Sequence, residues 1–172
     1  VVGGGVVGAS VLYHLTKWGW KDVMLVEKGI LTCGSTWHAA GGMHTINSDP
    51  NVAKLQEYTI HLYKELEEIS GHSTGLHMTG GVMLAATTER VDYLKQVHAR
   101  GKLLGMKTEF VDMDFVERVL PIVDTSHFKA ALWDDNEGHV DPVGVTTAYA
   151  KSAKIGGAEI VENCRVLGIR PN

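Results

Sequence analysis

The feature that most constrains the fold of this chain is a glycine-rich turn at its beginning. Val1 and Val2 lead into Gly3-Gly4-Gly5-Val6-Val7-Gly8, which has the spacing G-x-G-x-x-G. In this spacing the first glycine allows a tight turn out of a strand, and the second lets the backbone approach a ligand closely. The third lets the following helix lie against the sheet, with its N-terminal N–H groups directed at an anion. The turn therefore predicts a β-α-β unit that binds phosphate groups.

Three sequence features around the turn favour a dinucleotide as the ligand. An apolar strand precedes the turn, and a second apolar strand, Val23 to Val26, ends in Glu27. A carboxylate about 20 residues after the turn accepts hydrogen bonds from a ribose and disfavours a 2′-phosphate of the NADP type. Between the strands we expect an amphipathic helix whose apolar face comprises Val7, Val11, Leu12 and Leu15. Together these features predict a dinucleotide-binding α/β domain.

Length, charge and cysteine spacing exclude several other classes of protein. A chain of 172 residues can form one cored domain, or one domain with part of a second. The net charge of −4 and the lack of Lys/Arg clusters disfavour nucleic acid or an anionic membrane as the main partner. No apolar run approaches the roughly 18 residues of a membrane span. Cys33 and Cys164 have neither C-x-x-C nor zinc-site spacing, which predicts a reducing compartment.

The pattern of elements divides the chain into three sections. Residues 1–42 form the first part of the nucleotide-binding fold, residues 43–135 an α+β insertion that supplies a substrate-facing wall, and residues 136–172 a continuation of the first fold. The chain begins inside the first strand without an initiator Met and ends after a strand-like segment, Arg165 to Ile169. We therefore expect it to be the N-terminal part of a larger protein.

Hydrophobic periodicity and turn residues predict the elements within these sections. The expected helices lie at 50–70, 88–104, 113–120 and 142–153, and the expected strands at 79–87, 106–111, 130–133, 158–161 and 165–169.

A second candidate binding segment is the loop of small residues Gly34-Ser35-Thr36-Trp37-His38-Ala39-Ala40-Gly41-Gly42. Small residues let the backbone approach a flat ligand closely. His38 within this loop has three interpretations: a hydrogen-bonded structural histidine, a metal ligand, or a nucleophilic imidazole placed against a cofactor. No carboxylate or cysteine lies at ligand spacing from it, which disfavours the metal. The residues alone leave the other two open.

The string GSTWHAAG resembles the flavin-attachment loop of the dimethylglycine and sarcosine dehydrogenases, which are FAD enzymes of the D-amino-acid-oxidase-like superfamily. LYKELEEISG, TGGVMLA, EGHVDP and AEIVENCRVLGI also resemble segments of that family's FAD domain, in the same order along the chain. The resemblance implies an α/β, Rossmann-like FAD-binding domain of the glutathione-reductase/D-amino-acid-oxidase type, with an inserted α+β portion of a substrate domain. It also implies that His38 carries the isoalloxazine ring covalently through the 8α-methyl group.

The same resemblance assigns the other cofactor-binding positions. Val6 and Val7 would contact the pyrophosphate through the backbone, Glu27 and Lys28 would lie at the adenosine ribose, and the Val166 backbone would meet the adenine. Along the ribityl-diphosphate and beside the ring it places Gly34, Ser35, Thr36, Ala39, Ala40, Gly41 and Gly42.

Two further residues are candidates for roles near the flavin. Cys33 is a competing flavin anchor, since relatives in the superfamily use a cysteine, although its place in the loop does not match theirs. His139 is a candidate catalytic residue that could face the flavin cavity. The residues after it, Asp141 and Pro142, are typical of a helix start.

The function implied by the resemblance is oxidation of the N-methyl C–N bond of a small amine such as dimethylglycine or sarcosine, with hydride transfer to the flavin. The expected partners are that amine, an electron acceptor such as an electron-transfer flavoprotein, and tetrahydrofolate if a further domain is present. Nucleic acid and a membrane span are not expected. The expected location is cytoplasmic for a bacterial source and the mitochondrial matrix for a eukaryotic one.

Three alternative functions have sequence support. A regulatory subunit of a phosphatase in the same family keeps the fold but has lost the motif histidine, which His38 argues against. Another FAD-dependent amino acid or amine oxidase would share the fold. A nicotinamide-linked dehydrogenase would fit the glycine turn and Glu27 but would leave GSTWHAAG unexplained.

Overall fold

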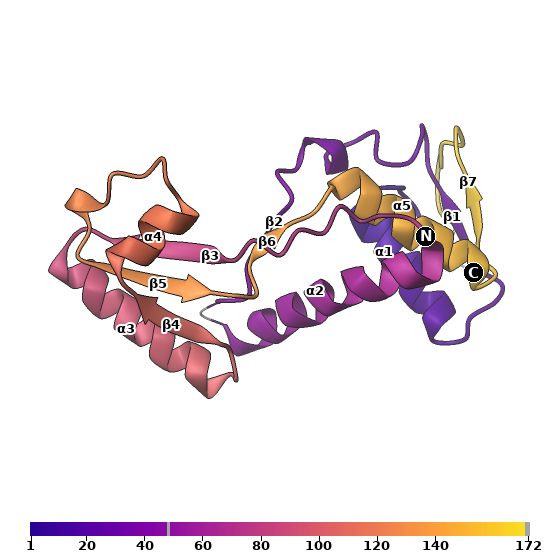
Figure 1. Cartoon of the computed structure of the whole chain (residues 1–172). Coiled ribbons are helices and arrows are strands. Elements are labelled where there is room, and N and C mark those ends of the chain that lie inside the picture. Colours follow the sequence, from indigo (N-terminus) through magenta and orange to yellow (C-terminus); the bar gives the residue numbers. More distant parts are fainter. Residues whose placement is uncertain (48, 171–172) are drawn as a thin grey trace. The chain divides into compact units, whose positions relative to one another are not determined.

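The chain forms two units in a computed structural model that describes residues 1–47 and 49–170 (Figure 1). Unit 1 comprises Val1–Gly41, Ile60–Leu76 and His139–Asn172, described as far as residue 170. Unit 2 comprises Gly42–Thr59 and His77–Gly138. Each unit mixes helices and strands, as the sequence predicts for an α/β fold with an α+β insertion.

Unit 1 is built on a short parallel sheet. Strand β1 (Met24–Val26) pairs in parallel with β7 (Glu159–Val161), so that Leu25 lies opposite Ile160. On its other side β1 accepts a parallel bridge between Val26 and Val2. The first apolar residues of the chain and the strand near its end therefore lie on either side of β1. This confirms the predicted strand after the glycine turn, whereas the predicted strand before it consists of a single bridge at Val2.

Two helices of unit 1, α1 (Val6–Lys17) and α5 (Pro142–Ile155), pack together. The rings of Tyr13 and Tyr149 lie 5.6 Å apart between their centroids. A Cβ on Gly156 would come within 2.7 Å of Thr16, so a glycine there permits the close approach. The predicted helix start at Asp141-Pro142 is confirmed, because the Asp141 side chain accepts the Val143 N–H at 3.0 Å.

The predicted apolar face of α1 is partly wrong. Leu12 is buried, but Val7 is 74% exposed and Val11 is 45% exposed. The buried face instead comprises Ala9, Leu12, Tyr13 and Thr16. Periodicity selects the large aliphatic residues, whereas the packing of α1 against α5 uses small and aromatic ones. Val7 and Val11 line a cavity described below.

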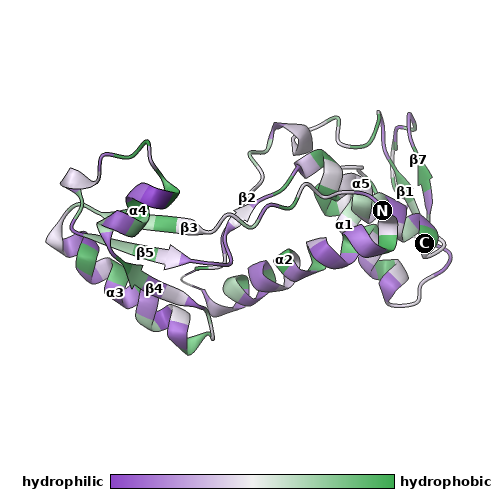
Figure 2. Cartoon of the chain, in the orientation of Figure 1, coloured by the Kyte–Doolittle hydropathy of each residue, from purple (hydrophilic) through white to green (hydrophobic). Residues whose placement is uncertain are grey.

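Helix α2 (Pro50–Ser70) begins and ends where the sequence predicts, at Asp49-Pro50 and before Gly71, which has φ +60°. Hydrophobic and hydrophilic residues alternate along it (Figure 2). Its second half belongs to unit 1, where Leu62 and Leu66 are buried. There Glu65 accepts hydrogen bonds from the Tyr13 hydroxyl at 3.2 Å and from the Lys17 ammonium at 2.8 Å.

Unit 2 contains a three-stranded antiparallel sheet in the order β3 (Gly81–Ala85), β5 (Ala130–Asp134), β4 (Thr108–Val111). Helices α3 (Thr88–Leu103) and α4 (Met113–Val119) and the short 3₁₀ turn η2 (Thr125–His127) complete it. The three strands and helices α3 and α4 confirm the predicted elements, whereas η2 was not predicted. Its core is made by Ala85, Leu94, Val97 and Leu132.

Three short elements remain: the 3₁₀ turn η1 (Thr36–His38), β2 (Gly42–Met43) and β6 (Gly138–His139). The predicted strand at 165–169 is wrong, because that segment has no regular structure. Asn163 turns the chain after β7 with φ +56°, and Leu167 and Ile169 are 92% and 82% exposed.

Within the described residues, no helix combines the length and apolar character that a membrane crossing requires.

Candidate cofactor-binding site

The glycine turn has the geometry that its spacing predicts. Gly3 adopts φ +104°, a conformation that residues with a side chain rarely adopt. A Cβ on Gly8 would lie 1.9 Å from the Gly3 carbonyl oxygen, so the start of α1 lies directly against the turn. Gly3 is required for its backbone conformation, and Gly8 is required because it has no side chain. Together the two glycines allow the N-terminus of α1 to lie next to the first residues of the chain.

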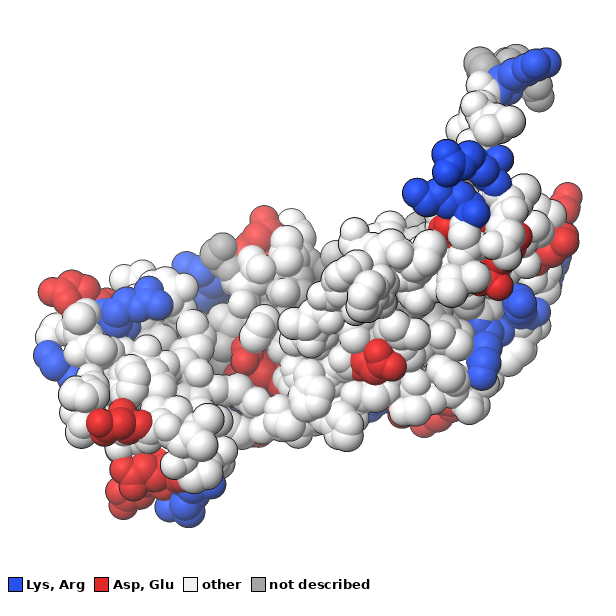
Figure 3. Space-filling model, turned by 90° about the horizontal axis from the view of Figure 1, so that it is seen from above, with Lys and Arg blue, Asp and Glu red and all other residues white. Residues whose placement is uncertain are grey.

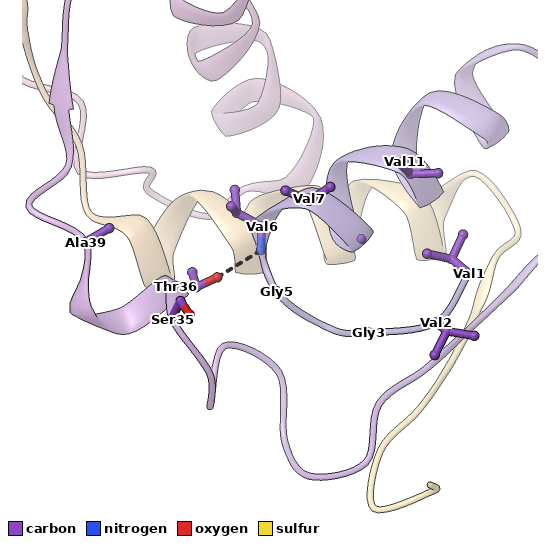
Figure 4. Close-up of a pocket in the computed structure, with 11 residues that line it drawn as sticks. Val1, Val2, Gly3, Gly5, Val6, Val7, Val11, Ser35, Thr36 and Ala39 are labelled. Atoms are coloured by element: carbon purple, nitrogen blue, oxygen red, sulfur yellow. Dashed lines mark hydrogen bonds between the residues drawn. The ribbon is translucent and has the colours of Figure 1, made fainter. Parts of the chain in front are cut away.

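A cavity of about 610 Å³ lies at this helix N-terminus (Figure 4). It is lined by Val1, Val2, Gly3, Gly5, Val6, Val7, Gly8, Val11, Ser35, Thr36 and Ala39. Figure 4 shows the glycine turn on one side and the loop of η1 on the other. The two candidate segments of the sequence analysis therefore form one site.

A hydrogen bond fixes the two segments to each other. The Val6 N–H donates to Thr36 Oγ1 at 3.0 Å, shown by the dashed line in Figure 4. Thr36 is 8% exposed. Its hydroxyl oxygen satisfies one of the N–H groups that lack a partner within the helix at its N-terminal end. Because its oxygen accepts this bond, the Thr36 hydroxyl hydrogen can be donated elsewhere.

His38 has one ring nitrogen engaged by the protein. Its Nδ1 lies 3.1 Å from the Gly34 carbonyl oxygen, and its ring centroid lies 3.9 Å from that of Trp37. A carbonyl oxygen only accepts hydrogen bonds, so we assign the hydrogen to Nδ1. Nε2 then carries the lone pair. The His38 side chain is exposed, so Nε2 is available to an external group.

A second cavity, of about 270 Å³, lies at the end of β1. It is lined by Val2, Gly3, Val26, Glu27, Lys28, Cys164, Arg165 and Val166. The parallel pairing of β1 with β7 brings the last three of these beside Glu27. The cavity thus unites Glu27, Lys28 and Val166, which the sequence analysis assigned to one half of the cofactor. It also includes Cys164 and Arg165, which the sequence analysis did not assign to the site.

Glu27 is a buried carboxylate, only 7% exposed. Its Oε2 accepts the Gly4 N–H at 2.7 Å, and its Oε1 accepts the Gly29 N–H at 2.8 Å. The Cys33 thiol lies 3.7 Å from Oε1 and donates to it. The backbone bond from Gly4, followed by that from Gly29, holds the pKa of Glu27 below its ordinary value. Glu27 is therefore ionised at neutral pH and braces the glycine turn.

We expect this carboxylate to make the stability of the protein depend on pH. A carboxylate with a lowered pKa stabilises the fold above its unfolded pKa, about 4.3, and this contribution is lost as the pH falls through the folded pKa. Glu27→Gln should cost about 1–3 kcal/mol near neutral pH, because its amide NH₂ must face one of the two backbone N–H donors. Denaturant unfolding of both proteins between about pH 6 and pH 3 measures this. The difference should shrink on acidification, and a constant difference would contradict the assignment.

Several predicted residues do not line either of these two cavities. Neither cavity is lined by Gly34, His38, Ala40, Gly41, Gly42 or His139. The Gly34 carbonyl oxygen accepts a hydrogen bond from the His38 ring. Gly41 has φ +75°, and its carbonyl oxygen accepts the Val140 N–H at 2.9 Å. Gly42 belongs to unit 2, and His139 is exposed in β6.

Unit 2 contains an ionisable pair that the sequence analysis missed. Glu137 Oε2 lies 3.2 Å from His44 Nδ1. Burial raises the pKa of Glu137, and the contact with His44 opposes that shift.

Within the described ranges 1–47 and 49–170, no three His, Cys, Asp or Glu residues gather as a metal site would require. On the face in Figure 3, cationic and anionic side chains are interspersed.

Comparison with known families gives a match over the full length of the chain. The family model described as "FAD dependent oxidoreductase" (DAO) matches residues 1–172. Dimethylglycine dehydrogenase of Rattus norvegicus is 36% identical over 99% of this chain and 20% of its own length. Sarcosine dehydrogenase of Homo sapiens is 34% identical over 99% and 19%. The pyruvate dehydrogenase phosphatase regulatory subunit of Mus musculus is 32% identical over 98% and 19%.

A solved structure shows the same fold. L-proline dehydrogenase of P. horikoshii superposes with a TM-score of 0.88 at 29% identity, covering 97% of this chain and 44% of that one. The chain spans about a fifth of the length of the curated relatives named above.

Proposed function

The chain belongs to the DAO family of FAD-dependent oxidoreductases, and we propose that it is part of an enzyme that oxidises the N-methyl C–N bond of a small amine. The observation that carries this proposal is His38, whose Nε2 is exposed in the loop beside the larger cavity. The similarity to dimethylglycine and sarcosine dehydrogenases supports it. When bound, FAD supplies the acceptor for the hydride of the amine.

The residues of the two cavities fit the two halves of FAD. The larger cavity is within the range of roughly 300–1,000 Å³ that small-molecule sites occupy. At its end the N-terminus of α1 offers its positive dipole to the diphosphate, and the Thr36 hydroxyl donates a hydrogen bond to a phosphate oxygen. In the smaller cavity, which Glu27 and Val166 line, Glu27 would accept a hydrogen bond from the ribose and the Val166 backbone would meet the adenine. Lys28 and Arg165 place cationic groups at the same cavity.

His38 is proposed to attach the flavin covalently. Because Nδ1 donates to Gly34, Nε2 would be the atom that holds the flavin, through a bond to its 8α-methyl carbon. A tethered cofactor cannot dissociate, and the bond to an imidazole raises its potential, which favours oxidation of an amine. The acceptor is proposed to be an electron-transfer flavoprotein, and a folate-binding step would need residues outside this chain.

A second candidate is a regulatory role, because a phosphatase regulatory subunit is among the relatives. An intact His38 with an available Nε2 favours the enzyme. A third, an oxidase of a different amino acid, differs from the proposal in its substrate and in its electron acceptor, which for an oxidase is dioxygen.

The test is anaerobic reduction of the flavin by candidate amines. Protein expressed from its whole reading frame is mixed with N,N-dimethylglycine, sarcosine or glycine, and the yellow absorbance is followed. The proposal expects rapid bleaching by an N-methylated amine and none by glycine, which is the matched control. Bleaching by unmethylated amino acids alone would support the oxidase, and bound flavin that no amine bleaches would support the regulatory role. A protein that binds no flavin would contradict both enzyme candidates and would favour the regulatory role.

A further inference from the structure

We propose that Cys33 is a positioning residue for FAD: its thiol fixes the Glu27 carboxylate in the orientation that receives the adenosine ribose. This inference rests on the proposed function, since it takes Glu27 as the ribose acceptor. The Cys33 Sγ lies 3.7 Å from Glu27 Oε1, within the range of a hydrogen bond that involves sulfur. Cys33 therefore lies beside the carboxylate that is proposed to receive the ribose, as a hydrogen-bond donor to it.

The distribution of donors over the carboxylate gives this contact its effect. A carboxylate has about four lone-pair sites, two on each oxygen. Among the residues that the structure describes, Oε1 accepts both the Gly29 N–H and the Cys33 S–H, whereas Oε2 accepts only the Gly4 N–H. Oε1 is thus saturated inside the protein, and Oε2 keeps one site for a ribose hydroxyl. The thiol in this way determines which oxygen faces the ligand.

The backbone around Cys33 is held independently of its side chain. The Asn163 N–H donates to the Gly29 carbonyl at 2.7 Å, and the Cys164 N–H donates to the Glu27 carbonyl at 2.9 Å. Thr32, with φ +68°, donates its N–H to the Gly4 carbonyl at 3.0 Å. Because these bonds use main-chain atoms, a substitution of Cys33 changes the contact with Glu27 and leaves the loop anchored.

The thiol lies beside Gly29 as well as beside the carboxylate. A Cβ built on Gly29 would lie 3.1 Å from Cys33 Sγ and 3.7 Å from Glu27 Oε1. Cys33 itself is exposed, so small substitutions fit at this position. Serine retains a donor at this place and alanine removes it, so the two substitutions separate the hydrogen bond from the packing.

The experiment measures the affinity of the apoprotein for FAD and for FMN, which lacks the adenosine half. A His38→Ala background makes binding reversible, and His38→Asn is a second background if the first does not fold. Cys33→Ala should weaken FAD binding about three- to tenfold and leave FMN binding unchanged. Cys33→Ser should restore most of the FAD affinity. In a Glu27→Gln background, Cys33→Ala should have no further effect, because its action passes through the carboxylate.

Several outcomes would overturn the inference. An unchanged FAD affinity in Cys33→Ala would remove any role for the thiol. Equal losses for FAD and FMN, or full additivity with Glu27→Gln, would show a general structural effect. Failure of the proposed function is distinguishable, because it would appear as bound flavin that no N-methylated amine bleaches, whereas this inference is tested by the affinity of the apoprotein for FAD and FMN.

Discussion

Replacing His38 with alanine is expected to release all of the flavin when the holoprotein is denatured in acid. In the parent protein the yellow absorbance should stay with the precipitate and with a peptide that contains His38, heavier by one FAD. The reason is chemical: the Gly34 carbonyl accepts the Nδ1 hydrogen, so Nε2 is the atom proposed to attack the flavin. Alanine has no nucleophile, and the flavin should appear in the supernatant. Absorbance of the two fractions and peptide mass measure the result.

Two control variants make this result specific. His61→Ala removes an exposed histidine on α2 and should keep the flavin covalently bound. Cys33→Ala removes the competing anchor and should also keep it, because its thiol donates to Glu27 at the ribose end. Flavin that stays with the precipitate in His38→Ala would reject the attachment site. Flavin lost only in Cys33→Ala would assign the anchor to that cysteine.

Local sequence signals predicted the parts of the fold that depend on neighbouring residues. Gly3 and Gly8 meet steric requirements that their spacing encodes, and Asp141 caps α5 with its own side chain. The pairing of β1 with β7 joins residues more than 130 positions apart. Their apolar character predicted strands, and the resemblance of Val166 to a known adenine position suggested that the two ends meet.

The misses arise where tertiary packing or side-chain contacts decide the outcome. Val7 and Val11 are apolar because they line a cavity, and periodicity cannot distinguish that surface from a core. Residues 165–169 have the composition of a strand but follow Asn163 in a left-handed turn, which pattern counting does not detect. The contact of Cys33 with Glu27 has no sequence signal, because a lone cysteine six residues after a carboxylate is unremarkable in a sequence.

The second large effect is expected at the last glycine of the turn. Gly8→Ala would place a Cβ 1.9 Å from the Gly3 carbonyl oxygen and 3.0 Å from its carbon. Both are backbone atoms, so relief requires α1 to move away from the turn. That movement would disturb the packing over Leu25, which is fully buried on β1. We expect a loss of about 2–4 kcal/mol in the free energy of unfolding.

The same displacement should weaken the hold on FAD, because it moves the helix N-terminus and the Val6 N–H away from Thr36. Denaturant unfolding of the apoprotein and FAD titration measure the two effects, and we expect at least a tenfold loss of affinity, equivalent to about 1.4 kcal/mol. Gly168→Ala is the matched control, since a Cβ there meets no atom within 4 Å. That control should change neither quantity. If Gly8→Ala were as stable as the parent and bound FAD equally well, close contact between helix and turn would not be what the motif requires. The glycine spacing would then lose its physical connection to cofactor binding in this chain.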